Sequence, residues 1–166
     1  MRRRGHAHVL PSDVDTDQII PGEYLTTVSR EELGQYALQG YDSEFTDRLE
    51  DGDIVVAGEN FGLGSSREAA PIALRNANVG AVVAESFARI FYRNAVNVGL
   101  VIVEIPGITE RVDDGDEVSV DVEAGRVTNH TTGETFETTP LPDDLLEILE
   151  AGGLVEYTRA KNAEKE

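Results

Sequence analysis

The sequence predicts an α/β fold with a mixed sheet, and three observations support that prediction. Residues 54–105 alternate β-branched runs with helix-like segments, in the strand–helix–strand–helix–strand order typical of parallel pairing. Residues 116–135 alternate apolar and polar side chains between turn residues, which predicts antiparallel strands. At 166 residues the chain has the size of one ordinary domain, so we expect residues 1–166 to form a single domain.

The first part of the chain predicts one strand, a polar loop and one helix. The strand covers residues 5–10, and the loop covers residues 13–21. Ser29 and Glu32 have the spacing of a capping box, which predicts a helix from there to about residue 38.

Alternating aspartates in the first loop resemble the start of a calcium-binding loop. Asp13, Asp15 and Asp17 have that spacing, but Gln18 stands where a calcium loop needs glycine and Tyr24 where it needs glutamate. We therefore favour the interpretation that Asp and Thr side chains hold this turn through hydrogen bonds to the backbone.

The centre of the chain predicts a buried strand, a glycine-rich loop and a helix. Residues 42–51 are polar, with a short helical turn at most, and residues 53–57 form the strand. The loop covers residues 58–68 and the helix residues 69–76. Pro71 lacks a backbone N–H, so the helix has a kink there or begins close to it.

The glycine-rich loop is a candidate anion site. Gly62 and Gly64 let backbone N–H groups approach a ligand, and the helix N-terminus that follows favours negative charge. A structural role is equally open, because Ser65 and Glu68 have the spacing of a capping box with Ser65 as the N-cap.

Arg67 is the residue of this loop that a capping role does not explain. A cation at a helix N-terminus opposes the helix dipole, and a broken local rule at a glycine-lined turn indicates function. The loop matches neither a Walker A motif nor a complete dinucleotide fingerprint nor a nucleophile elbow.

After the loop, the chain continues the parallel pattern. Residues 79–84 predict a strand, residues 87–96 a helix that ends near Gly99, and residues 100–105 another strand. On that helix Arg89 and Arg93 share one face. This face either is solvated or contacts a partner chain, and the sequence favours neither reading.

The last third of the chain changes character. Residues 116–122 and 126–135 predict antiparallel strands, and residues 141–151 predict a helix. We expect residues 160–166 to be frayed.

Charge excludes some classes of partner. The net charge is −18, from 32 acidic and 14 basic residues, so the protein's own field repels nucleic acid and anionic membranes. The scattered acidic residues favour a halophilic source. No apolar run has the length of a membrane span, and no apolar signal segment follows the basic start of the chain, so we expect a cytoplasmic protein.

The chain has no cysteine, which excludes disulfides and a cysteine-ligated iron–sulfur cluster within it. Its three histidines are scattered in a way that favours packing or solvent exposure over metal binding, so we expect no metal ligand here.

Four stretches together resemble a known family. They are NFGLGSSRE at 60–68, DVDTDQIIP at 13–21, YL at 24–25 and SFARIFYRN at 86–94. In order and spacing they resemble the swivelling β/β/α domain of the aconitase superfamily, which can be a separate small subunit, as in 3-isopropylmalate dehydratase and archaeal homoaconitase. Leu63 stands where a cysteine is common in the family and Ala69 where a histidine is common.

The resemblance implies a hydro-lyase that converts 2-isopropylmalate to 3-isopropylmalate by dehydration and rehydration, in leucine biosynthesis. Ser65 would then be the catalytic base, Arg67 and Ser66 would bind a substrate carboxylate, and Asp17 would position the arginine. A large subunit would carry the [4Fe-4S] cluster, so the active site would form where the two chains meet.

The resemblance also indicates the substrate. Family members that take a tricarboxylate have an arginine near the position of Thr26, and Thr26 is uncharged, which favours an isopropyl group. A small subunit of homoaconitase or of another hydroxy-dicarboxylate hydro-lyase remains the alternative. A stand-alone anion-binding module is the alternative from a different class.

Overall fold

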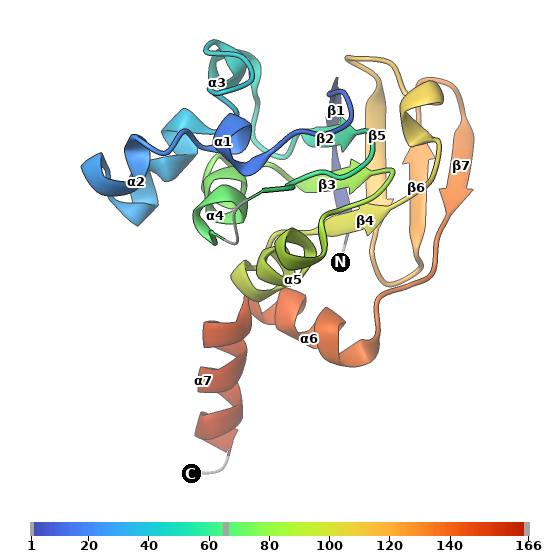
Figure 1. Cartoon of the computed structure of the whole chain (residues 1–166). Coiled ribbons are helices and arrows are strands. Elements are labelled where there is room, and N and C mark those ends of the chain that lie inside the picture. The colour runs from blue at the N-terminus through green and yellow to red at the C-terminus, as the bar shows by residue number, and fades with distance from the viewer. Residues whose placement is uncertain (1, 65–66, 165–166) are drawn as a thin grey trace.

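A mixed seven-stranded sheet forms the centre of the molecule (Figure 1). The computed structural model describes residues 2–64 and 67–164. Along the sheet the strands follow the order β4-β3-β2-β1-β5-β6-β7. The strands are β1 (Arg2–Val9), β2 (Ile54–Ala57), β3 (Ala81–Ala84), β4 (Ile102–Glu104), β5 (Glu117–Asp121), β6 (Arg126–Asn129) and β7 (Glu134–Glu137).

Strands β1 to β4 are parallel, as the alternation of strands and helices predicted. β2 and β3 are buried along their whole length, which explains their continuous apolar runs. α4 (Ala69–Asn76) connects β2 to β3, and α5 (Arg89–Val98) connects β3 to β4. Both connections move the same way along the sheet, so right-handed crossovers place the two helices on one face. Figure 1 shows them next to each other.

The other half of the sheet is antiparallel, also as predicted. β5 pairs with β1, β6 with β5, and β7 with β6. Along these strands Val118, Val120 and Val127 are fully buried and the charged side chains point out, which is the period-two pattern of a sheet with one solvated face. Gly133 has a φ of 81° in the turn between β6 and β7.

Between β1 and β2 the chain forms short helices. These are α1 (Thr16–Ile19), α2 (Tyr24–Thr27), the 3-10 helix η1 (Arg30–Tyr36) and α3 (Phe45–Arg48). The predicted capping box is wrong: Ser29 is the N-cap of η1 without a side-chain hydrogen bond. η1 packs closely onto α4, since Gly34 lies so near the backbone of Asn76 that no Cβ would fit between them.

The C-terminal part contains η2 (Ile108–Glu110), α6 (Asp143–Ala151) and α7 (Leu154–Glu164). Gly152 ends α6 in a left-handed conformation with a φ of 97°. The expectation that the chain frays from residue 160 is wrong as far as Glu164, because α7 continues to that residue. Figure 1 shows α7 pointing away from the sheet, and none of its residues is buried.

Candidate functional site

Three loops meet at the carboxyl ends of the parallel strands β1, β2 and β3. The backbone N–H of Asp13 donates to Glu59 O at 2.8 Å, and the N–H of Gly62 donates to Val14 O at 2.8 Å. The third loop joins them through Phe61, whose N–H donates to Ser86 O at 3.1 Å. This edge of a parallel sheet is where α/β proteins bind their ligands.

The glycine-rich loop depends on glycine at position 62. Gly62 has a φ of 85°, and a Cβ there would collide with the ring of Phe91 on α5. Phe91 also packs edge-on against Phe61, with ring centroids 5.3 Å apart. The loop is therefore pressed against α5, and any side chain at position 62 would push it away.

The aspartate-rich loop continues into α1, which carries Asp17. Asp15 caps this helix, since its carboxylate accepts from Gln18 N at 2.8 Å and the Gln18 side chain accepts from Asp15 N at 3.0 Å. The prediction that side chains hold this turn through backbone hydrogen bonds is confirmed for Asp15. Gly40 lies against the backbone of Asp17 and leaves no room for a Cβ, so the position of α1 is fixed from two sides.

Arg67 and Asp17 are brought together by this arrangement. Nη2 of Arg67 donates to Oδ1 of Asp17 at 2.7 Å, although fifty positions separate them. The side chains are 31% and 71% exposed, so the guanidinium is partly covered and still reaches solvent. A Cβ on Gly22 would lie 3.5 Å from Nη1 of Arg67, so the chain also passes close to the other side of the guanidinium. The fold therefore holds the guanidinium of Arg67 in place at this edge of the sheet.

The predicted base Ser65 and its neighbour Ser66 lie outside the described residues. The capping box with Glu68 at the third helical position is wrong, because Glu68 itself is the N-cap of α4 and makes no side-chain capping bond. The late start explains Pro71: it stands in the first turn, where backbone N–H groups have no partner within the helix.

Thr26 lies on α2, in the segment that follows Gly22. It is exposed, and its side chain forms no hydrogen bond within the described ranges 2–64 and 67–164. Beside α2, a hollow of about 150 Å³ is lined by Leu25, Val28, Leu33, Ala69 and other residues of α4 and η1. Thr26 itself does not line this hollow.

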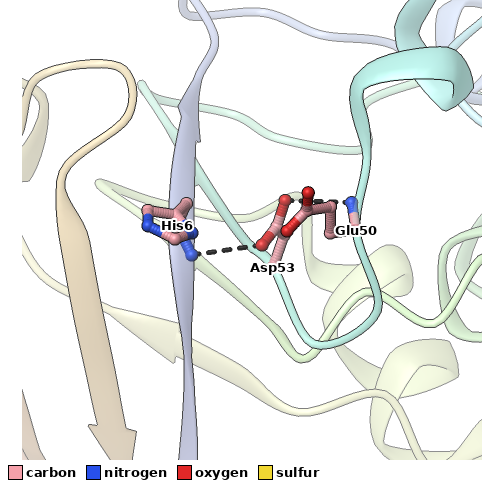
Figure 2. Close-up of side chains that lie close together, drawn as sticks. All are labelled: His6, Glu50 and Asp53. Carbon is pink, nitrogen blue, oxygen red and sulfur yellow. Dashed lines mark hydrogen bonds between the residues drawn. The ribbon is translucent and has the colours of Figure 1, made fainter.

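A second polar cluster lies on β1 and the segment before β2 (Figure 2). His6, Glu50 and Asp53 each offer one potential metal-ligand atom, and these atoms lie within 4.8 Å of one another. Asp53 is buried, and its Oδ1 accepts from His6 N at 3.1 Å. Its Oδ2 accepts from Glu50 N at 3.0 Å and contacts Nε2 of His8 at 2.7 Å. These hydrogen bonds connect β1 to β2 and account for the buried carboxylate without an ion.

The pKa of Asp53 reflects this environment. Burial raises the pKa of the carboxyl, but the hydrogen bonds from His8, Glu50 and His6 outweigh burial and hold the pKa below its usual value. Asp53 is therefore a buried carboxylate that stabilises the fold.

Sequence reasoning missed two residues near the candidate site. Phe91 was part of a predicted helix, but nothing in a single sequence shows that it faces Gly62. Gly22 lies beside Arg67, and the signal that could have found it is a glycine directly after Pro21 in a loop already suspected of function.

Comparison with known proteins identifies the class of protein. The model of the aconitase C-terminal domain matches residues 4–107, which include all three loops of the site. The chain belongs to this family. Its residues do not fit an iron–sulfur cluster, since it has no cysteine, and in this family the cluster is on the large subunit.

Individual relatives narrow the class further. The chain is 55% identical to 3-isopropylmalate dehydratase small subunit 1 of Methanopyrus kandleri, over 94% of this chain and 92% of that protein. It is 49% identical to the isopropylmalate/citramalate isomerase small subunit of Methanocaldococcus jannaschii, over 98% and 97%. A crystal structure of 3-isopropylmalate dehydratase from M. jannaschii has 43% identity and a TM-score of 0.93, covering 99% of this chain and 98% of that one.

Proposed function

We propose that this chain is the small subunit of a hydro-lyase that isomerises 2-isopropylmalate to 3-isopropylmalate by dehydration and rehydration, in leucine biosynthesis. The observation that supports this most is the Arg67–Asp17 contact at the carboxyl ends of the parallel strands. It supplies the fixed cation that a dicarboxylate substrate needs, in a chain about half identical to curated small subunits.

Arg67 binds a substrate carboxylate in this proposal. A guanidinium holds a carboxylate through two parallel hydrogen bonds, and a contact with Asp17 fixes the plane of the fork before substrate arrives. Ser66 adds a hydrogen bond to the same carboxylate.

Ser65 removes the proton from the carbon next to that carboxylate. A serine hydroxyl is a very weak acid, so its anion needs stabilisation by the loop amides, by the N-terminus of α4 and by Arg67. The proton then stays on Ser65, close to the carbon, and rehydration can return it to the substrate.

The site is completed by a second chain. Arg67 and Asp17 both reach solvent, with Asp17 71% exposed, which suits a half-site. The cluster-bearing large subunit covers it and supplies the Lewis acid for the hydroxyl group.

The substrate is assigned to the alkyl-substituted class. Thr26 offers no cation for a third carboxylate, and the nearby hollow beside α2 is lined largely by aliphatic side chains. The M. jannaschii relative carries citramalate in its name as well as isopropylmalate, so a methyl-substituted acid belongs in the test. Homocitrate is the tricarboxylate alternative.

The acidic surface supports the proposal that this is a cytoplasmic protein of a halophile, and that it binds neither nucleic acid nor membranes. A net charge of −18 keeps it hydrated at high salt and repels polyanions. No helix within residues 2–64 and 67–164 combines the length and apolar character of a membrane span.

The test is reconstitution with the large subunit from the same genome. Under anaerobic conditions the pair should isomerise 2-isopropylmalate, and each chain alone should be inactive. Citramalate and homocitrate are the comparison substrates. Turnover by this chain alone would refute the half-site, and a stable pair active only on homocitrate would favour homoaconitase. A chain that binds malonate but forms no pair would indicate a stand-alone anion-binding module.

A further inference from the structure

Helix α5 lies in a segment of the chain that is poor in acidic residues. The chain has 32 acidic residues among 166, yet residues 69–103 contain a single one, Glu85. That carboxylate accepts from Gly107 N at 3.0 Å and also bonds the Thr109 hydroxyl, so it is engaged by its own chain. By contrast, α6 begins with Asp143 and Asp144. Neither α4 nor α5 therefore contains a carboxylate, a feature that this part of the chain shares with residues 1–12.

The exposed face of α5 combines two cations with an aliphatic side chain. Arg89, Ile90 and Arg93 lie within one third of the helix circumference and are all exposed, while Phe91 and Ala95 on the opposite face are buried. Ile90 is 54% exposed, far more than a core isoleucine. We name Arg89, Ile90 and Arg93 the α5 face.

The two arginines of the α5 face have no partner within the described residues. Neither guanidinium forms an ion pair or hydrogen bond there, although acidic side chains are abundant in the chain. Elsewhere Arg4, Arg48 and Arg111 pair with carboxylates within 3 Å, whereas Arg75 and Arg159 resemble Arg89 and Arg93 in forming no such pair within the described residues.

The position of these cations on the helix is unfavourable for the isolated chain. The first turn of α5 has no acidic residue, its N-cap Ala88 has no capping side chain, and Arg89 adds positive charge to the positive end of the helix dipole. Carboxylates supplied by another molecule would remove this local cost.

The α5 face adjoins the candidate site. Ala88 N donates to Phe61 O at 3.0 Å, so Arg89 follows directly after the junction with the glycine-rich loop. Phe61 and Phe91 hold α5 against that loop, and Figure 1 shows α5 beside α4, which follows the loop. A partner that covers the loops around Arg67 is therefore well placed to reach the α5 face.

We propose that the α5 face is the docking surface for the large subunit, whose contacting surface carries carboxylates opposite Arg89 and Arg93 and an apolar hollow for Ile90. This inference rests on the proposed function, which supplies the partner. A second copy of this chain is disfavoured as the occupant, because two bodies of charge −18 repel each other.

Binding of purified chain to purified large subunit, by calorimetry at low and at molar KCl, tests the proposal. At low salt Arg89→Glu/Arg93→Glu should weaken binding about 100-fold, since like charges would then face each other. Ile90→Ala should weaken it about 5- to 10-fold. At molar KCl the Debye length falls to about 3 Å, so the charge effect should shrink while the Ile90→Ala effect persists.

Arg126→Glu is the control for the single reversals Arg89→Glu and Arg93→Glu, which change the net charge by the same amount. Arg126 is an exposed arginine on β6, in the antiparallel half of the sheet, with only a loose pair to Glu137 at 3.6 Å. Its reversal should change the affinity less than 2-fold. An equal loss in this control would assign the effect to net charge and overturn the proposal. Arg89→Gln/Arg93→Gln keeps the test valid if the double reversal does not fold.

The outcomes separate the two proposals. If the wild-type pair forms and the double reversal binds as tightly as wild type, the α5 face is wrong and the proposed function stands. If the pair forms but does not turn over 2-isopropylmalate, the proposed reaction is wrong. The measured affinities of the variants then still decide whether the large subunit docks on the α5 face. If the chain forms no pair, both proposals fall. If it elutes as a dimer that the α5 variants disrupt, a second copy is the occupant and only the docking proposal falls.

Discussion

At the scale of one residue, Arg67 is a locally unfavourable cation that a tertiary contact stabilises. A cation just before α4 opposes the helix dipole, but the carboxylate of Asp17 at 2.7 Å offsets this cost. Asp17 is in turn fixed by a capped helix turn and by the close approach of Gly40. The guanidinium is therefore oriented by the fold and does not need a ligand to order it.

Ser65→Ala separates chemistry from structure in the reconstituted pair. Loss of a proton-transfer group should lower kcat about 10²- to 10⁴-fold. The melting temperature should move by no more than a few degrees, since even a lost cap is worth about 1 kcal/mol. Ser66→Ala is the control and should raise KM more than it lowers kcat. A Ser65→Ala pair with wild-type turnover would mean that another group is the base.

Thr26→Arg tests the substrate assignment. A charge facing an alkyl group is costly, so the variant pair should lose kcat/KM for 2-isopropylmalate by about tenfold or more and gain relative activity on homocitrate. Thr27→Arg, one residue further along α2, is the control and should leave the ratio of the two activities unchanged. Identical kinetic constants for wild type and Thr26→Arg would remove Thr26 from the pocket.

At the scale of elements, the sequence predicted best where local and tertiary requirements agree. α5 and α6 end at Gly99 and Gly152, as predicted, because a left-handed residue is needed there whatever packs nearby. The close packing of η1 on α4 could not be predicted, since α4 is distant in the sequence and no local pattern connects the two elements. α7 was missed because its helix contains no apolar stripe to detect.

The location of the candidate site could be predicted from the motif of the glycine-rich loop. The geometry of the site could not. The glycine-rich loop and Arg67 violate local rules that a single sequence displays. That Asp17 contacts Arg67 follows from the resemblance to a family, because no periodicity connects positions fifty residues apart. The Asp53 network was missed, since a carboxylate before a buried strand looks like an ordinary turn residue.

Asp53→Asn probes the connection between β1 and β2. At neutral pH the amide would face backbone N–H donors, so the free energy of unfolding should fall by about 1–3 kcal/mol. The folded-state pKa of Asp53 lies below its ordinary value near 3.9, so the carboxylate stabilises the fold above about pH 4. This stabilisation is lost as the pH falls through the folded-state pKa.

The difference between wild type and Asp53→Asn should therefore shrink below about pH 4, measured by urea unfolding at fixed molar KCl. Asp51→Asn is the control, because Asp51 is exposed and accepts one bond from Asn78 at 3.2 Å. A difference that stays constant down to pH 2.5 would show that the charge of Asp53 contributes nothing.

At the scale of the whole molecule, charge determines the conditions in which the fold is stable. The net charge of −18 produces self-repulsion that salt must screen. Local crowding adds to it, and the pKa of Glu150 is raised because its carboxyl hydrogen-bonds to the carboxyl of Glu123.

Thermal melts from 0.1 to 3 M KCl should show the melting temperature rising by about 10 °C or more. Glu150→Gln should melt higher than wild type at 0.1 M KCl and converge with it at 3 M, since it removes one member of a like-charged pair. Glu110→Gln is the exposed control. A flat wild-type curve would contradict a halophilic origin.

The place of β1 in the sheet has a consequence for how the protein is made. Ala7 to Val9 pair with β2, but Arg2 to His6 pair with β5, and Arg2 stands opposite Asp121. β1 is therefore synthesised well before β5, and its second edge stays uncovered until the residues between the two strands have followed. Until then β1 has an unpaired edge that is open to wrong pairing.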